Sequence, residues 1–349
     1  MIGQENRVRP LRVRPGARFT CLGDGLCCMD VHGVGPVKPR EAEALRLISP
    51  EVVTREPTQE IDVLTMGSDG RCLFLTEGGC ALHASLGPEA KPHSCRRFPF
   101  GLVATPNGGR ITTEHRCPCR TLGDRPAVDE AAAEAALRDG GARLRADYRV
   151  GPRIPLAEHR SMPFEQWERH EATLLERLSA GEDPMGVLGG NPFPEVDCAS
   201  WEQIASEMLD AGIEGMDERG YETRFEAALH WFGETVLALV AGHPPERHDR
   251  PWADAFDGAE ARSPDARTMR DVLADWVADE LWALRWAPSW TFRTLQAELG
   301  TRLAVADHMA RRLVDRGVRP DRAAAEAVTV GELVGTSDWW TEVVHRMRL

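Results

Sequence analysis

Apolar residues recur at intervals of three and four along most of the chain beyond residue 160. Such a stripe is typical of a helix that buries one face. It is found in four segments, 164–178, 225–240, 269–286 and 301–316. Gly317 follows the last of these, at the position where helices commonly end in the left-handed conformation, with Pro320 just beyond. We also expect a helix over 127–148, which is rich in Ala, Glu, Leu and Arg.

The first third of the chain carries short apolar runs between turn residues. In 69–83 one such run lies between two turn signals with a cysteine at each end, and a hairpin there would bring the two sulfurs together. Segments 101–105 and 110–114 flank Pro-Asn-Gly-Gly, which predicts a second hairpin. Gly and Pro punctuate 181–194 and 242–264, which are therefore predicted to be loops or an insertion.

These patterns predict an α+β protein with two parts. Residues 1–122 are expected to form a small, irregular, cysteine-rich metal-binding module with short hairpins. Residues 123–349 are expected to form a mainly α-helical, Trp-rich acidic domain. The length agrees with this division, because domains of roughly 150 residues are common.

Tryptophan is confined to the second part, since all ten tryptophans lie between Trp167 and Trp340. The roughly helical spacing of four tryptophans favours core packing over a ligand-stacking box; they are Trp276, Trp282, Trp286 and Trp290. The ninth cysteine, Cys198, stands alone without a nearby His and is predicted to be a buried small hydrophobe.

The two parts also differ in charge. Residues 1–120 hold 16 Lys and Arg against 13 Asp and Glu, whereas the rest of the chain has a net charge of -16. A general nucleic-acid surface needs clustered Lys and Arg, so no nucleic-acid partner is expected. The acidic charge is typical of a solvated helical exterior. No apolar stretch suits a secretory signal or a membrane span, so we expect a cytoplasmic protein without a membrane partner.

Cysteines are crowded into the first third of the chain. Eight of the nine lie between Cys21 and Cys119. In a reducing cytosol disulfides do not persist, and thiolates remain available to soft metal ions. The candidate metal ligands are Cys21, Cys27, Cys28, Cys72, Cys80, Cys95, Cys117 and Cys119.

The spacing of these cysteines bears on the kind of metal. Neighbouring side chains diverge, so Cys27 and Cys28 are expected to serve two metals, two irons of one cluster, or one metal and one packing role. The second hairpin leads directly to Cys117 and Cys119 and would place them beside Cys95, which predicts one composite site. Paired Cys-x2-4-Cys knuckles of zinc sites are absent. Iron–sulfur ligation tolerates dispersed cysteines, so iron–sulfur is favoured over zinc.

Catalytic residues are harder to assign. His32, His83, His93 and His115 lie within the module, and His83 ranks first among them as a metal ligand or proton carrier. No Gly-x-Ser-x-Gly elbow is present, and a catalytic Cys-His pair cannot be chosen among so many thiols. The sequence therefore assigns neither catalytic nor cofactor-binding residues.

Four motifs carry a family resemblance. In order, they are Cys-x5-Cys-Cys, Gly-x-Cys-x-Phe-Leu, Gly-Cys-x-Leu-His and Pro-x-x-Cys-Arg-Arg-Phe-Pro. Together they resemble the YkgJ-like cysteine-cluster family over about residues 19–120. That family is described as a zinc- or iron-chelating domain, so the resemblance implies metal binding. The chain departs from it at Asp24, which replaces a cysteine of the opening motif, and at His83, where the family commonly has Tyr.

A second resemblance concerns the flagellin lysine N-methylases, which join a similar cysteine module to a long helical region. The step from His115 to Cys119 and the helical segment 271–334 are similar to that branch. This resemblance implies an S-adenosylmethionine site and a protein substrate. The sequence itself shows neither a glycine-rich nucleotide loop after a strand nor a Cys-x3-Cys-x2-Cys run.

Two functions follow as predictions. In the first, the protein binds a metal ion through its N-terminal cysteines, as an iron–sulfur cluster or as zinc, and its helical part offers a surface to a protein partner. In the second, it is an S-adenosylmethionine-dependent protein lysine N-methyltransferase that carries an iron–sulfur cluster. The sequence does not decide between a metal-binding protein and an enzyme.

Overall fold

The computed structural model describes residues 8–21, 23, 25–31, 34–56, 60–139, 143–214, 216, 217, 220, 221, 224–243, 250–263 and 265–349. Helices predominate in these residues and short strands accompany them, so the predicted α+β class is confirmed. Among the described residues, no helix has both the length and the apolar character that a membrane crossing requires.

The largest sheet has four strands in the order β1-β7-β6-β10. β6 (Phe100–Thr105) and β7 (Gly108–Thr113) are antiparallel and form the hairpin predicted around Pro-Asn-Gly-Gly. β1 (Leu11–Val13) lies parallel to β7, and β10 (Tyr148–Arg149) lies parallel to β6. The sheet therefore joins the N-terminal end of the chain to residues that follow the cysteine-rich region.

The helix expected over 127–148 is much shorter, so this prediction was wrong in its second half. α5 (Glu130–Leu137) begins after Asp129, whose carboxylate caps it, and it ends where β8 begins. β8 (Arg138–Asp139), β9 (Arg143–Leu144) and β10 follow. The edge of β6 offers backbone partners there, because the N–H of Val150 donates to the carbonyl of Ala104. Helix propensity is a weak preference that such tertiary pairing overrides.

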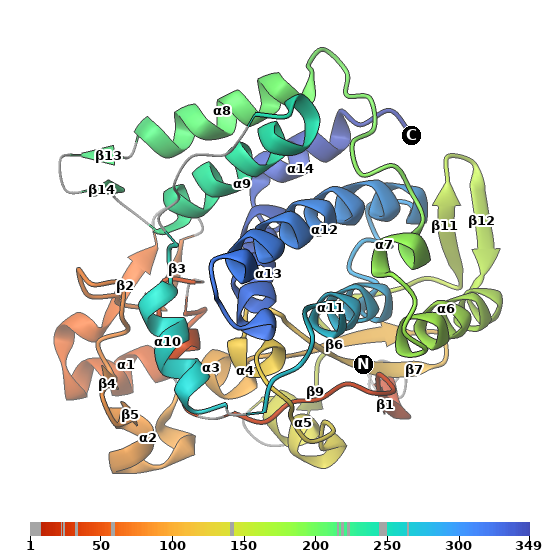
Figure 1. Cartoon of the computed structure of the whole chain (residues 1–349). Helices are drawn as coiled ribbons and strands as arrows, with labels where there is room; N and C mark the ends of the chain where they lie inside the picture. Colours follow the sequence, from red (N-terminus) through yellow and green to blue (C-terminus); the bar gives the residue numbers. More distant parts are fainter. Residues whose placement is uncertain are drawn as a thin grey trace.

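The cysteine-rich region consists of short elements around a small hydrophobic cluster. Figure 1 shows most of them together at the lower left, in orange and red. They are η2 (Leu26–Cys28), α1 (Pro39–Ile48), η3 (Pro50–Val52), β2 (Val53–Glu56), β3 (Ile61–Leu64), β4 (Leu75–Thr76), β5 (Gly79–Cys80), α2 (Ala81–Leu86), η4 (Pro88–Ala90), α3 (His93–Arg97) and α4 (Pro118–Thr121). β2 pairs with β3 and β4 with β5, both antiparallel.

The second part of the chain is mainly helical, as predicted. After the hairpin of β11 (Arg153–Ala157) and β12 (Arg160–Pro163), its elements are α6 (Phe164–Ser179), α7 (Pro184–Leu188), α8 (Trp201–Glu214), β13 (Met216–Asp217), β14 (Gly220–Tyr221), α9 (Arg224–Ala241), α10 (Ala253–Ala261), α11 (Met269–Ala283), α12 (Phe292–Asp315), α13 (Pro320–Gly335) and α14 (Asp338–His345). The four predicted helical segments correspond to α6, α9, α11 and α12. Figure 1 shows α11, α12 and α13 at the centre of the molecule.

Two short helices occur where loops were expected. α7 lies within 181–194 and begins after Asp183, whose carboxylate accepts a hydrogen bond from a backbone N–H of its first turn. α10 lies within 242–264 and buries Phe256 and Ala259 against the helices. Pro184 and Gly189 mark the two ends of α7, but Gly258 lies inside α10, so glycine and proline do not by themselves indicate continuous loops here.

The main hydrophobic cluster contains residues from both parts of the chain. Leu26, Met29 and Leu122 join the helical residues in it. The expected core role is confirmed for Trp276, Trp282 and Trp286, which are buried, whereas Trp290 is partly buried against the same core. Cys198 was expected to be buried, but it is exposed and has a φ of 61°. The division of the chain into two domains near residue 122 stays a prediction.

Candidate functional site

The turn that carries Cys27 and Cys28 is anchored in the main core. The side chains on either side of the two cysteines, Leu26 and Met29, are buried there. The next carboxylate, that of Asp30, accepts hydrogen bonds from the Arg224 guanidinium at 2.9 Å and from the Trp252 indole at 3.0 Å. The helical part of the chain therefore fixes the position of this turn.

Gly25 allows this turn to lie close to Leu75, in the segment between Cys72 and Cys80. Its φ is 80°, in the left-handed region, and a Cβ added there would lie 2.7 Å from Cδ1 of Leu75. Glycine avoids both the strain and the clash. The carbonyl of Gly25 also accepts a 2.8 Å hydrogen bond from the N–H of Cys28, which turns the chain.

Cys72 lies directly beside Cys28. The N–H of Cys72 donates to the carbonyl of Cys28 at 2.8 Å. The hairpin predicted within 69–83 is present, and β5 returns Cys80 opposite Leu75, close enough for its charge to affect the pKa of Cys72. The hairpin brings Cys80 near Cys72, and the backbone hydrogen bond brings Cys72 near Cys28, so three cysteines gather here.

Cys95 joins them from α3. This short helix is held against α1, because the N–H of His93 donates to the Glu41 carboxylate at 2.9 Å. The side chain of Cys95 packs against the small hydrophobic cluster that contains Cys72. We call Cys28, Cys72, Cys80 and Cys95 the thiol cluster.

Lys91 places a positive charge among these sulfurs. Burial lowers the pKa of Lys91, but the thiols of Cys95, Cys80, Cys28 and Cys27 outweigh that effect and raise the pKa above its ordinary value. The ammonium group is therefore close to cysteines of η2, of the β4–β5 hairpin and of α3.

Two thiols of the cluster, those of Cys72 and Cys95, are protonated near neutral pH. Burial raises the pKa of Cys72 to about 11. Burial, together with the charge of Cys28, raises the pKa of Cys95 to about 12. A metal ion bound to Cys72 and Cys95 would supply the positive charge that favours their thiolate forms.

The sulfurs do not stand at the positions of metal ligands. Within the described ranges, no three His, Cys, Asp or Glu side chains form an arrangement that could hold a metal ion. The donor chemistry still fits a soft metal, because all the gathered groups are thiols.

The remaining predicted ligands lie elsewhere or apart from the cluster. Cys21 is exposed, and its sulfur accepts a 3.4 Å hydrogen bond from the N–H of Gly23. Cys117 and Cys119 are buried at α4, which packs against α13. The fourth, Cys27, is half-buried and contributes to the raised pKa of Lys91. A place for these four cysteines in one composite site stays a prediction.

The other polar candidates have different surroundings. His83 is exposed on α2. His93 lines a cavity beside the thiols. Asp24 and His32 lie outside the described residues, so the structure gives no position for them.

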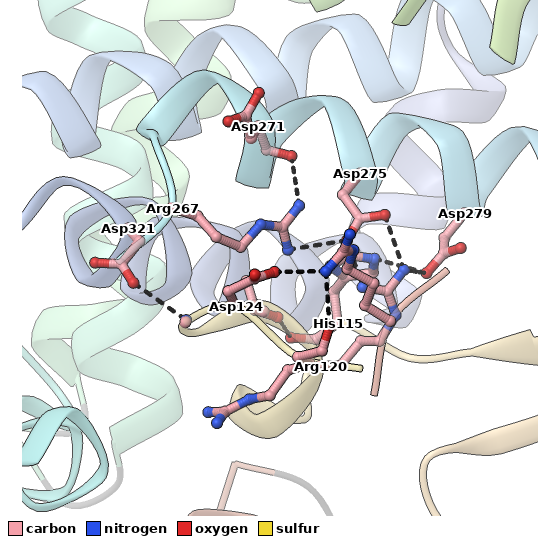
Figure 2. A network of polar contacts seen from close by, with 12 residues as sticks. His115, Arg120, Asp124, Arg267, Asp271, Asp275, Asp279 and Asp321 are labelled. Atoms are coloured by element: carbon pink, nitrogen blue, oxygen red, sulfur yellow. Dashed lines mark hydrogen bonds and ion pairs between the residues drawn. The ribbon is translucent and has the colours of Figure 1, made fainter. Parts of the chain in front are cut away.

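A buried network of charges joins the end of the cysteine region to α11. Figure 2 shows Arg120 facing Asp275 and Asp279, which lie one turn apart. Arg120 donates to Asp279 at 2.6 Å and to both carboxylate oxygens of Asp275, one of them at 3.0 Å. Arg14, which follows β1, donates to Asp279 at 2.5 Å and also pairs with Asp275. Arg267 adds a contact to Asp275 at 3.1 Å.

The network fixes the charge state of its members. Burial would raise the pKa of Asp275 and Asp279, but the charges of Arg120 and Arg14 outweigh it and hold both pKa values well below their usual range. Burial, with the charge of Arg120, lowers the pKa of His115. The neutral ring of His115 then donates from Nε2 to the Asp279 carboxylate at 2.8 Å.

A cavity of about 1660 Å³ adjoins this network, between the segment after β1 and helices α6 and α11. Arg110 lies over the ring of Trp282, 4.2 Å from its centroid, and donates to the Glu171 carboxylate at 2.8 Å. Burial raises the pKa of Glu171 despite this contact. All three side chains line the cavity.

Sequence reasoning missed the charged residues of the network. A signal existed in 269–286, where Asp275 and Asp279 are four residues apart among apolar positions. Every residue of α11 from Val272 onward is buried, so these carboxylates had to find partners inside the protein. The partners Arg14 and Arg120 could not be found from spacing, because they lie more than a hundred residues away in sequence.

Comparison with known proteins adds no relative. No family model, no curated protein and no solved structure matches the chain. The resemblance to the YkgJ-like family, and the weaker one to the flagellin lysine N-methylases, therefore stay predictions from the motifs.

Replacing Arg120 by Met should lower the free energy of unfolding by about 3–5 kcal/mol, because two buried carboxylates would lose their shared partner. Urea denaturation would measure this. Arg311→Met removes a comparable but solvent-exposed Arg–Asp pair, with side chains 65% and 33% exposed, and is the control. It should change the free energy by about 0.5 kcal/mol or less. A loss of under about 1 kcal/mol for Arg120→Met would contradict a buried, mutually dependent network.

The network also predicts an acid-dependent loss of stability. The pKa values of Asp275 and Asp279 are depressed in the folded state, so their contribution is present above the ordinary value of 3.8 and is lost as pH falls below it. Between pH 6 and pH 3 each should account for about 1 kcal/mol. Urea denaturation at pH 6 and at pH 3 checks this. The change in the free energy of unfolding between the two pH values should be smaller for Asp275→Asn than for the parent protein. An equal difference in both proteins would count against depressed pKa values.

Proposed function

We propose that the thiol cluster binds a soft metal, either iron in an iron–sulfur cluster or zinc. The observation that carries this proposal is the gathering of Cys28, Cys72, Cys80 and Cys95 from separate blocks around the Lys91 ammonium. Thiolate-rich sites select these metals over harder cations such as magnesium or calcium. The order of the cysteine motifs, which resembles a metal-chelating family, supports the same proposal.

The four thiols would hold the metal, and Lys91 would offset part of the negative charge that they acquire. A bound metal supplies a strong link between segments that are distant in the sequence. Because the pKa values of Cys72 and Cys95 are raised by burial, these thiols release protons when they become ligands. Binding is therefore expected to weaken as pH falls.

A structural role for the metal agrees with the size of the surrounding core. The hydrophobic cluster around the thiols comprises ten buried residues, and the elements that form it are short strands and helices. Small cores of this kind often need a metal or other cross-link, because they bury too little apolar surface to offset the entropy of ordering the chain. The metal would then hold together the blocks of η2, the β4–β5 hairpin and α3.

A second candidate function is an S-adenosylmethionine-dependent protein lysine N-methyltransferase. The observation in its favour is the large cavity between α6 and α11, whose described lining has nine acidic and seven basic side chains, a surplus of two negative charges. Both the sulfonium of the cofactor and the ammonium of a lysine substrate are cations, which acidic groups attract. In this case the metal would stabilise the module and the reaction would take place in the cavity.

The metal proposal is tested by purification without oxygen, followed by metal analysis and a visible spectrum. Iron with sulfide and a broad brown absorbance would identify a cluster, whereas a colourless zinc protein would identify a zinc site. Single Cys→Ser changes in the thiol cluster should remove most of the metal, because they remove a soft ligand. Cys198→Ser, at an exposed position, is the matched control and should keep it. A parent protein without metal, or cluster variants with full metal, would refute the proposal.

The methyltransferase alternative predicts that the protein, purified with its metal, binds S-adenosylmethionine. Calorimetric titration should show saturable heat, and the melting temperature should rise with ligand concentration, because a ligand that binds only the folded state stabilises it. Glu171→Gln removes one acidic group from the cavity wall and should weaken the binding. The absence of both heat and a melting shift would remove this alternative.

A further inference from the structure

A second, smaller cavity lies against the thiol cluster and is not explained by metal binding alone. Its volume is about 330 Å³, within the range of small-molecule sites. Cys27, Cys28 and Cys95 form part of its wall. The charged side chains of its lining are Lys38, Lys91, Arg97, Arg116, Glu114 and Asp147.

The lining carries an excess of positive charge. Among the residues that the structure describes, four basic and two acidic side chains contribute to it, a surplus of two positive charges. Each carboxylate is already matched to an arginine: Arg116 donates to Glu114 at 2.5 Å, and Arg97 pairs with Asp147. The cavity therefore favours a negatively charged ligand.

Hydrogen-bond donors in the wall lack acceptors. The Nε atom of Arg116 and the hydroxyl of Ser94 are buried, and neither has a hydrogen-bond partner within the described part of the chain. Lys91 forms no ion pair with any described carboxylate, and its main electrostatic partners are thiols. A buried donor without an acceptor destabilises the protein, so a ligand that accepts hydrogen bonds would be stabilised here.

We propose that this cavity binds a small oxyanion, a carboxylate or phosphate group, through Arg116, Ser94 and Lys91. The ligand would lie beside Cys28 and Cys95, and in this respect the inference rests on the proposed metal site. The cysteine region would then combine a metal with an anion site, and the bound molecule would be a small acidic compound. Charge-assisted hydrogen bonds from arginine and lysine give such sites most of their affinity.

The test uses the full-length protein as purified, with its metal content measured on the same sample. Inorganic phosphate and acetate are titrated separately by calorimetry at constant ionic strength. We expect saturable binding of at least one of them. Phosphate alone would identify the ligand group as a phosphate, and acetate alone as a carboxylate.

Variants locate the binding. Arg116→Gln should weaken the affinity about tenfold or more, because it removes a charged donor. Ser94→Ala should weaken it about threefold, as expected for one neutral donor. Arg177→Gln removes the same charge from an exposed pair outside the cavity and should leave the affinity unchanged. All three variants should keep the metal content of the parent.

Failure of this inference is distinguishable from failure of the metal proposal. A protein that holds metal but binds neither anion, or binds one equally well after Arg116→Gln, would overturn the anion site alone. A protein that binds the anion in an Arg116-dependent manner but contains no metal would uphold the anion site and overturn the metal proposal. If Arg116→Gln loses the metal and no anion binding is seen, the basic residues support the metal site, and the anion site is overturned.

Discussion

The buried pairing of Arg14 and Arg120 with Asp275 and Asp279 is the interaction on which the arrangement of the chain depends. Taking charges out of water costs several kcal/mol per ion, and only close, multiple hydrogen bonds offset that cost. All four side chains are buried, and each carboxylate receives donors from both arginines. The segment after β1, helix α4 and helix α11 must therefore keep their relative positions.

The buried network constrains the position of the thiol cluster through the chain that leads to α4, and a second set of contacts holds the turn with Cys28. The chain runs from β7 to α4 past Glu114, whose N–H is bonded to the carbonyl of Pro99 just beyond α3. The turn with Cys28 is held by Leu26 in the main core and by the contacts of Asp30 with α9 and Trp252. The cysteines thus lie in a region whose borders are set by the helical part, while its own core is small.

The candidate metal site and the cavity beside it share this region and complement each other in charge. Burial raises the pKa of Cys72 and of Cys95, and the Lys91 ammonium lies close to the cysteines. The basic side chains that line the smaller cavity add further positive charge beside the cysteines. The large cavity between α6 and α11 is different, because its described lining has nine acidic and seven basic side chains and so carries a small surplus of negative charge. The molecule therefore presents two cavities with opposite preferences for charge.

Local sequence patterns determined much of the fold and half of the thiol cluster. The apolar stripes of α6, α9 and α11 and the turn residues between β6 and β7 act over a few residues, so periodicity and turn chemistry suffice to predict them. The approach of Cys72 to Cys80 follows from a hairpin in the same way. Only the tertiary structure decided that Cys28 and Cys95 join them, that the end of 127–148 pairs with β6, and that Arg120 meets Asp279. Those contacts link residues far apart in the chain, and their partners are selected by burial and charge in the folded core, which no local pattern records.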